Sequence, residues 1–241
     1  MNIQSNTYTY IYSTVIVLIV ATGLAVVASA LKPAQNKNVE IEKKQNILTS
    51  LHVVSDAGNA EKLYSEFITD SYTLNSKGEK VTGVDPFTIN LRAEMKKKPS
   101  ARNLPAFEAK KGDSTFVVIP VYGKGLWGPI WGYVSFRKEA QVQEGIPHYN
   151  TIYGVMFDHK GETPGLGAEI NQPFFQNHFN GKKVFNDQGK FVSVQVVKGG
   201  ADPSSPYQVD AISGGTITSK GLQAMLDSCL VTYQNYFKSN N

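Results

Sequence analysis

The sequence contains very little cysteine. Its 241 residues include one cysteine, Cys229, and four histidines. A single cysteine excludes an internal disulfide framework, and it also excludes an all-cysteine metal or iron–sulfur site within this chain. The histidines lack the spacing of zinc ligands, so we expect no metal site. Cys229 lies on the apolar face of a C-terminal helical pattern, and we expect it to pack in the core.

Charge is absent from the first part of the chain. Residues 1–31 contain no Asp, Glu, Lys or Arg, so all 24 basic and 20 acidic residues lie in 32–241, which carries the net charge of +4. Nucleic-acid-binding proteins usually show a dense basic face, which this small surplus does not suggest. We therefore expect no nucleic-acid partner.

The uncharged region contains a long apolar run, Ile11–Leu31, after a short tail of residues 1–10. A helix of 21 residues spans about 31 Å, close to the thickness of a bilayer core. Tyr8, Tyr10 and Tyr12 resemble an interfacial aromatic belt. A cleaved signal peptide is the competing interpretation, because residues 28–30 read Ala-Ser-Ala, but a basic n-region is missing and the run is long. We expect a membrane anchor, because the run is apolar on every face, unlike a soluble helix.

Orientation is predicted from the lysines that flank this run. Lys32, Lys37, Lys43 and Lys44 follow it, and no Lys or Arg precedes it. The positive-inside rule, applied to this count, puts residues 32–241 in the cytoplasm.

The remainder predicts an α+β fold. Residues 32–110 read as a linker and an N-terminal helical part, with helical spacing at 47–54 and 63–68 and a solvated loop within 85–102. Strand patterns begin at Ser114 and open a core of residues 111–241. Because strict β-α-β alternation is missing, we expect an antiparallel sheet and a closing helix. The predicted strands are 115–122, 132–136, 151–157 and 191–197, and the predicted terminal helix is 219–237.

The segment Asp210–Ser219 joins the strand region to the terminal helix. It reads DAISGGTITS, with two glycines and four hydroxyl side chains just before a helix. Unpaired N–H groups and the positive end of the helix dipole attract a phosphate there, and glycines allow close approach. The simpler alternative is ordinary capping by Thr218 or Ser219. The segment lacks the nucleotide-hydrolysing P-loop pattern.

A second segment, His159–Gly167, follows a strand and reads HKGETPGLG. It is either a tight hairpin turn or a loop against a planar ligand, in which the glycines leave room and Leu166 faces a ring.

These segments together resemble one family. Ser213–Thr218 (SGGTIT) is similar to a flavinylation motif, S-G-A-T-x-T; Glu162–Gly167 matches an E-T-P-G-L-G loop of the same flavin domain; and Gly125–Gly132 (GLWGPIWG) is similar to its G-L-W turn. With the N-terminal anchor, the chain resembles the family of C subunits of the Na+-translocating NADH:quinone reductase. The resemblance implies an FMN-binding domain related to the G subunit of the Rnf complex.

The resemblance also implies which residues hold the cofactor. FMN would be joined through its phosphate to the hydroxyl of Thr216 by a separate flavin transferase, with Thr218 as the fallback acceptor. One departure is Gly215, where the family has alanine. No residue is expected to act as a general acid or base. The implied cofactor-binding set is Thr216, Ser213, Gly214, Gly215, Thr218, Glu162, Thr163, Gly165, Leu166, Gly167, Trp127 and Trp131.

The family further implies a place in the cell. The chain would pass electrons from NADH towards ubiquinone or menaquinone, coupled to Na+ export, within a complex of six subunits. Its flavin domain would face the periplasm from the inner membrane, against the lysine count, and we follow the family. The G subunit of an Rnf complex and an anchored, flavin-free binding domain are the alternatives.

Overall fold

The N-terminal helix is longer than the sequence predicts. In this computed structural model, which describes residues 5–239, helix α1 runs from Asn6 to Ser50. Residues 32–46, expected as a linker or the start of a surface helix, continue it through Pro33. These residues are rich in Lys, Glu, Gln and Asn, and among them Lys, Glu and Gln favour helix. Within the described part of the chain, α1 alone is long and apolar enough to cross a membrane, by length and composition.

The chain forms two compact units, residues 1–42 and 43–241. In the first unit, the side chains of the apolar run are exposed on every side of the helix. This exposure is typical of a segment whose solvent is lipid rather than water.

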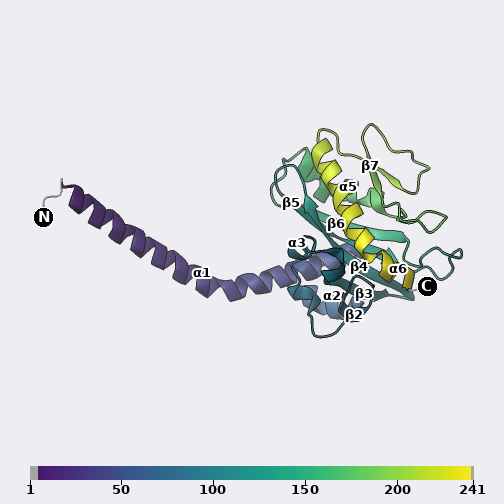
Figure 1. The fold of residues 1–241 in the computed structure, drawn as a ribbon, viewed down its shortest axis with the longest axis horizontal. Coiled ribbons are helices and arrows are strands. Elements are labelled where there is room, and N and C mark those ends of the chain that lie inside the picture. Colours follow the sequence, from purple (N-terminus) through teal and green to yellow (C-terminus); the bar gives the residue numbers. More distant parts are fainter. Residues whose placement is uncertain (1–4, 240–241) are drawn as a thin grey trace. The chain divides into compact units, whose positions relative to one another are not determined.

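The second unit is built on one antiparallel sheet (Figure 1). Its strands lie in the order β2-β1-β3-β4-β5-β6, and every neighbouring pair is antiparallel. The strands are β1 Ile68–Leu74, β2 Lys80–Val81, β3 Leu104–Lys111, β4 Ser114–Lys124, β5 Pro129–Arg137 and β6 Thr151–His159. The predicted α+β class with an antiparallel sheet is therefore confirmed.

Three strands precede the predicted strand region. The prediction that strands begin at Ser114 is wrong, because β1, β2 and β3 come earlier and β3 pairs with β4. Strand β1 follows α2 (Ala60–Phe67) directly. Its sequence, ITDSYTL, is polar at its start and lacks the alternation that marks a strand. The domain boundary at residue 110 stays a prediction, but sheet pairing crosses it.

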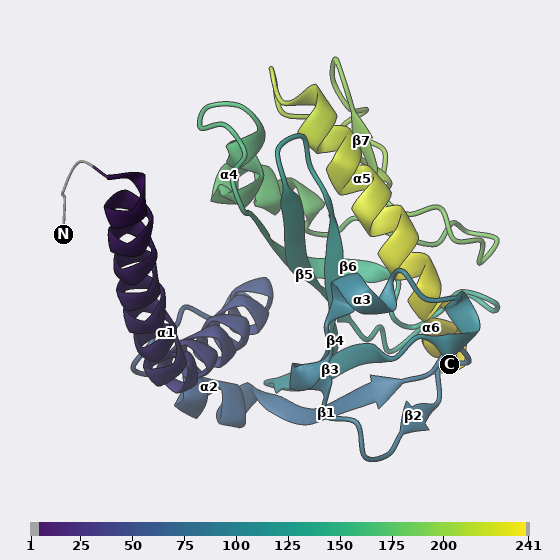
Figure 2. The same ribbon diagram turned by 60° about the vertical axis from the view of Figure 1, so that its left-hand side comes forward.

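Each face of the sheet is covered by helix. Helix α5 (Thr216–Leu230) lies across one face and contacts β4, as Figures 1 and 2 show. On the opposite face, Ile47 in the last turn of α1 and Leu51 just after the helix are buried in one cluster with Phe107, Phe116 and Tyr133. The sheet is thus the middle layer, and its two faces are available for different tasks.

The remaining elements are short. The predicted strand at 191–197 shrinks to β7, which pairs in parallel with β8. The predicted terminal helix is divided into α5, a 3-10 turn and α6, and Cys229 is buried on it as predicted. Bounds of the short elements are η1 Pro86–Thr88, α3 Leu91–Glu94, η2 Pro99–Ala101, η3 Gly167–Asn171, α4 Pro173–Gln176, η4 Asn177–Phe179, β7 Gln195–Val197, β8 Gln208–Asp210, η5 Val231–Tyr233 and α6 Gln234–Ser239.

Candidate functional site

Helix α5 begins without a side-chain cap. Its N-cap is Gly215 and its first residue is Thr216, so the prediction that Thr218 or Ser219 caps the helix is wrong. No acceptor within residues 5–239 is present for the N–H groups of Thr216, Ile217 and Thr218. The Ser219 hydroxyl instead accepts from the Ile212 N–H at 3.1 Å. The first turn therefore keeps free donors, which suit an anion.

Glu162 connects the three segments that the sequence singles out. Its Oε2 accepts from the Thr218 hydroxyl at 2.5 Å, and its Oε1 accepts from the Trp127 N–H at 2.9 Å. Only 5% of Glu162 and 1% of Thr218 is exposed. Each carboxylate oxygen thus accepts one hydrogen bond from the protein, and Glu162 lies inside the site rather than on its surface.

Glycines allow the close packing around this carboxylate. A Cβ on Gly167 would lie 2.6 Å from Glu162 Oε2 and would also collide with the Thr218 hydroxyl. Gly214 has a φ of +73°, and a Cβ there would collide with the side chain of Leu166. Positive φ and close approach are the two conditions that require glycine.

The departure from the family pattern at Gly215 has a local explanation. A Cβ there would lie 3.0 Å from Ile212 Cγ2 and 3.3 Å from the Gly167 N atom. The neighbouring loop therefore occupies part of the space that an alanine methyl group would need. Thr216, the next residue, is half-buried and keeps its position at the start of the helix.

The loop after β6 is a compact turn. The Thr163 carbonyl accepts from the N–H groups of Leu166 and Ala168, both at 3.1 Å. Gly165 has a φ of +74°, and its N–H donates to Glu169 Oε1 at 2.9 Å. The turn leaves the Leu166 side chain exposed, so the tight turn and the ligand-facing leucine are compatible with each other.

Two cavities flank the segment that precedes α5, and Ala211 lines both. One, of about 380 Å³, is lined by Thr216 and by two cations, Lys198 and Lys220. The other, of about 300 Å³, is lined by Ser213 and Phe174. A phosphate-bearing, partly apolar ligand fits this arrangement, because the donors and lysines lie beside Thr216 and apolar surface lies nearby.

Exposed apolar side chains gather on the same segments. Seven large hydrophobic residues are exposed in the part of the second unit that the structure describes, and five belong to the three segments or to α4 beside them. Composition alone does not reveal three of them, Leu126, Phe174 and Ile217, because exposure depends on the fold. The five are Leu126, Trp127, Leu166, Phe174 and Ile217.

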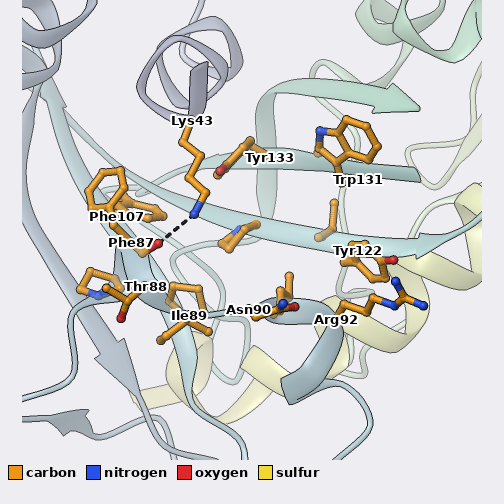
Figure 3. A pocket seen from close by; sticks show the side chains of 16 residues that line it. Lys43, Phe87, Thr88, Ile89, Asn90, Arg92, Phe107, Tyr122, Trp131 and Tyr133 are labelled. Atoms are coloured by element: carbon orange, nitrogen blue, oxygen red, sulfur yellow. Dashed lines mark hydrogen bonds between the residues drawn. The ribbon is translucent and has the colours of Figure 1, made fainter. Parts of the chain in front are cut away.

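Trp131 lies apart from this cluster. It is on β5 opposite Tyr122 of β4 and lines a cavity of about 510 Å³ with Tyr133, Arg92 and Lys43 (Figure 3). Ile130 and Val134 of the same strand point into the core beneath α5, so Trp131 faces the other side of the sheet. The structure therefore brings eleven of the twelve predicted residues together and leaves Trp131 on the opposite face.

Titratable groups elsewhere give no second centre. Burial raises the pKa of the Cys229 thiol, which keeps it protonated and unreactive. No cluster of three or more His, Cys, Asp or Glu side chains that could hold a metal ion is present between residues 5 and 239.

Comparison with known proteins identifies the same region. Residues 125–231 match the model of the FMN-binding domain family. The chain is 32% identical over 228 residues to the C subunit of a Na(+)-translocating NADH-quinone reductase from Haemophilus ducreyi, covering 87% of this chain and 84% of that protein. The corresponding protein from Yersinia pestis is 29% identical over 229 residues, covering 87% and 82% of the two chains.

Two crystal structures have the same fold. One is the C subunit of a Na(+)-translocating NADH-quinone reductase from Parabacteroides distasonis, with a TM-score of 0.75, 41% identity, and coverage of 88% of this chain and 98% of that chain. The other is Shewanella oneidensis NqrC, with a TM-score of 0.67, 27% identity, and coverage of 86% and 98%.

Proposed function

The chain belongs to the NqrC family, the C subunits of the Na+-translocating NADH-quinone reductase, and we propose that it carries FMN bound covalently to Thr216. In this proposal the chain is anchored in the membrane by the apolar run of α1 and exchanges electrons with other subunits of its complex. The electrons that it transfers pass from NADH towards ubiquinone or menaquinone, and this transfer is coupled to Na+ export.

The observation that carries the proposal is the uncapped first turn of α5. Thr216 is its first residue, and the free N–H donors of this turn lie at the positive end of the helix dipole. A phosphoester on the Thr216 oxygen would lie at this helix end, on a cavity that Lys198, Lys220 and Asp227 also line. The threonine oxygen would attack the phosphorus of an activated flavin donor, a flavin phosphate joined to a nucleotide through a P–O–P bond; that P–O bond breaks, and the nucleotide phosphate leaves with the hydroxyl proton.

Thr218, the fallback acceptor, is much less suitable. Its side chain is buried, and its hydroxyl already donates to Glu162. A phosphoester there would require the loss of this hydrogen bond and the opening of the packed loop around Gly167. Burial and hydrogen bonding therefore support Thr216 over Thr218.

The protein's contribution to electron transfer is positional. FMN, when bound, supplies the redox chemistry, and the chain sets its location and exposure. A covalent bond prevents loss of the cofactor from a surface site. The exposed side chains of Trp127 and Leu166 lie on the segments that surround Thr216 and would shield one side of an apolar ring.

The orientation proposal also gains support. Of the four lysines that argue for a cytoplasmic domain, two belong to the folded second unit. Lys43 Nζ donates to the Phe87 carbonyl at 2.8 Å, and Lys44 Nζ lies 3.6 Å from Glu61 Oε1. The charge bias is a rule for short flanking segments, and long domains such as residues 43–241 are translocated largely regardless of charge. We therefore keep the periplasmic placement, with the anchor in the inner membrane.

Covalent attachment is tested by intact-mass measurement of the full chain, purified after expression with and without a flavin transferase. We expect a mass increase equal to one FMN minus water, and fluorescence that survives denaturing electrophoresis, only with the transferase. An unmodified chain under both conditions would contradict the covalent proposal and favour a flavin-free binding domain. Co-purification of the other subunits tests the assembly of six.

Orientation is tested with an introduced cysteine. Cys229 is buried, so it gives little background in labelling with a membrane-impermeant thiol reagent. Gln188 is exposed, and Gln188→Cys should be labelled in whole cells whose outer membrane is permeabilised. Labelling that requires lysis of the inner membrane would place the domain in the cytoplasm.

A further inference from the structure

Glu162 is a buried acid without a cation. Its partners are one hydroxyl and one backbone N–H, and no lysine, arginine or histidine forms an ion pair with it within residues 5–239. Burying an unpaired carboxylate costs free energy. The hydrogen bonds through which Glu162 joins other segments must therefore offset this free-energy cost.

The two partners belong to different parts of the fold. Trp127 lies at the tip of the hairpin between β4 and β5, and Thr218 lies in the first turn of α5. Glu162 itself is in the loop after β6, where its own N–H donates to His159 Nδ1 at 3.2 Å. One side chain thus joins three segments that are far apart in the sequence.

The first turn of α5 has two differently exposed sides. On the buried side the Thr218 hydroxyl donates to Glu162, and on the half-buried side lies Thr216, the proposed attachment point of the phosphate. Each carboxylate oxygen accepts a hydrogen bond from the chain, and only 5% of Glu162 is exposed, so its side chain presents little surface to a cofactor. Its effect on attachment would therefore pass through the residues that it holds.

We propose that Glu162 is a positioning residue that ties the Trp127 hairpin to α5 and thereby fixes the Thr216 hydroxyl for flavin attachment. This inference rests on the proposed function. It assigns Glu162 a role inside the protein rather than contact with FMN, and it makes the hydrogen bonds to Thr218 and Trp127 the means of action.

Glutamine is the informative replacement at this position. The carbonyl of the new side chain would accept from the Trp127 N–H, and its amide would donate to the Thr218 hydroxyl, which can also accept. Glu162→Gln therefore keeps both connections without the charge, whereas Glu162→Ala loses both. Thr218→Val removes one connection at nearly constant volume.

The loop supplies a matched control in Glu169. Its Oε1 accepts from the Gly165 N–H at 2.9 Å, so it also holds the loop, but it makes no hydrogen bond to α5 or to the hairpin among the described residues. Glu169→Ala should weaken the loop without releasing the helix. A difference in flavin incorporation between Glu162→Ala and Glu169→Ala therefore measures the effect of the link between the hairpin and α5.

The experiment measures the rate of covalent flavin incorporation into the full chain in membranes, with a fixed amount of transferase. Misplacement of a reacting group by about 1 Å can cost about 100-fold in rate, so we expect Glu162→Ala to slow incorporation by at least about tenfold. Thr218→Val should be intermediate, and Glu162→Gln should remain close to wild type. Glu169→Ala, which alters the lining of the cavity beside Ser213 but leaves the connection to α5 intact, should slow incorporation less than Glu162→Ala. Thermal unfolding of each variant verifies that folded protein is compared.

A second readout does not involve flavin. In chains made without transferase, hydrogen exchange of the Trp127 amide should accelerate in Glu162→Ala and stay slow in Glu162→Gln. Wild-type incorporation with an unchanged rate in Glu162→Ala would overturn the inference, as would a Glu162→Gln variant as slow as Glu162→Ala. If Glu162→Ala does not fold, a wild-type rate in Thr218→Val overturns it. Failure of the wild type to incorporate flavin would instead contradict the proposed function.

Discussion

Two tryptophans of one short run lie in different surroundings, one at the end of a hairpin and one on the face of the sheet opposite α5. Trp127 is at the tip of the β4–β5 hairpin with 70% of its surface exposed. Trp131 is partly buried beside Tyr122 on the face of the sheet opposite α5, which we call the outer face. The two are equivalent as flavin contacts when only the sequence is considered. The difference arises because alternation along β5 sends Ile130 into the core and Trp131 away from it.

The two sides also differ in chemistry. Beside Thr216 the helix end has free backbone donors, and one buried acid joins three segments. The outer cavity is aromatic, and its Lys43 is already bonded to the Phe87 carbonyl, as Figure 3 shows. The outer cavity also holds a cation, Arg92, but the helix beside it, α3, is capped by the Asn90 side chain. An uncapped helix end is therefore what distinguishes the α5 side as a phosphate site.

The largest expected effect separates the two sides directly. Thr216→Ala should abolish covalent flavin, because the acceptor oxygen is removed, and should change the free energy of unfolding by less than about 1 kcal/mol, since the side chain is half-exposed. Thr216→Ser should retain part of the modification. In-gel flavin fluorescence and thermal unfolding check both results. Undiminished fluorescence of Thr216→Ala would mean that another residue is the acceptor.

A packing change within the cluster should come next. Gly167→Ala places a methyl group against Glu162 and Thr218, so we expect a loss of roughly 1–3 kcal/mol in stability together with slower flavin attachment. Gly161→Ala is the control, because its added methyl group meets no atom within 4 Å. Chemical denaturation measures both. Equal stability of the two variants would show that the cluster tolerates a methyl group without strain.

The tryptophan pair tests the comparison itself. Trp131→Ala should lower the free energy of unfolding by roughly 1–3 kcal/mol while leaving the flavin spectrum unchanged, and Trp127→Ala should cost less than about 0.5 kcal/mol. We expect the Trp127 variant to alter the fluorescence of the attached flavin, because Trp127 lies on a segment of the cofactor site. Reversed spectral effects would contradict the assignment of Trp131 to the other face.

The smallest expected effect concerns a second buried acid. Burial opposes ionisation of Glu94, but hydrogen bonds from the Asn103 N–H and Lys97 outweigh it, and the pKa of Glu94 lies below its ordinary value. Its stabilising contribution is therefore present above the unfolded-state pKa and is lost as the pH falls through the lower folded-state pKa. Glu94→Gln should flatten the acid limb of a stability-against-pH curve. An unchanged acid limb would contradict this assignment.

Much of the fold follows from sequence pattern. The apolar run, the strands from β4 to β6 and the amphipathic C-terminal helix all carry clear periodicity. Strand β1 does not, because its polar start follows α2 without a turn signal, and its conformation depends on pairing with β3. Long-range pairing of this kind leaves no local signal.

The residue types of the site could be predicted from the sequence, but the hydrogen bonds that join its segments could not. Two glycines and four hydroxyl side chains before a helix indicate an anion site, and the structure begins this helix at Thr216 rather than at the predicted Ser219. The alternative of a cap at Thr218 or Ser219 is wrong because the helix begins earlier, at Thr216, and the Thr218 hydroxyl donates to Glu162, a buried acid from another segment. A hydrogen bond between residues 56 positions apart cannot be read from local spacing.

The central claim is that FMN is bound to Thr216 through a phosphoester. Peptide mass spectrometry of the mature chain, isolated from membranes that contain the transferase, tests it most directly. We expect one flavin-bearing peptide that includes residues 210–220, with the adduct on Thr216. An adduct on Thr218 or Ser213, or an unmodified Thr216 in a chain that carries flavin elsewhere, would contradict it.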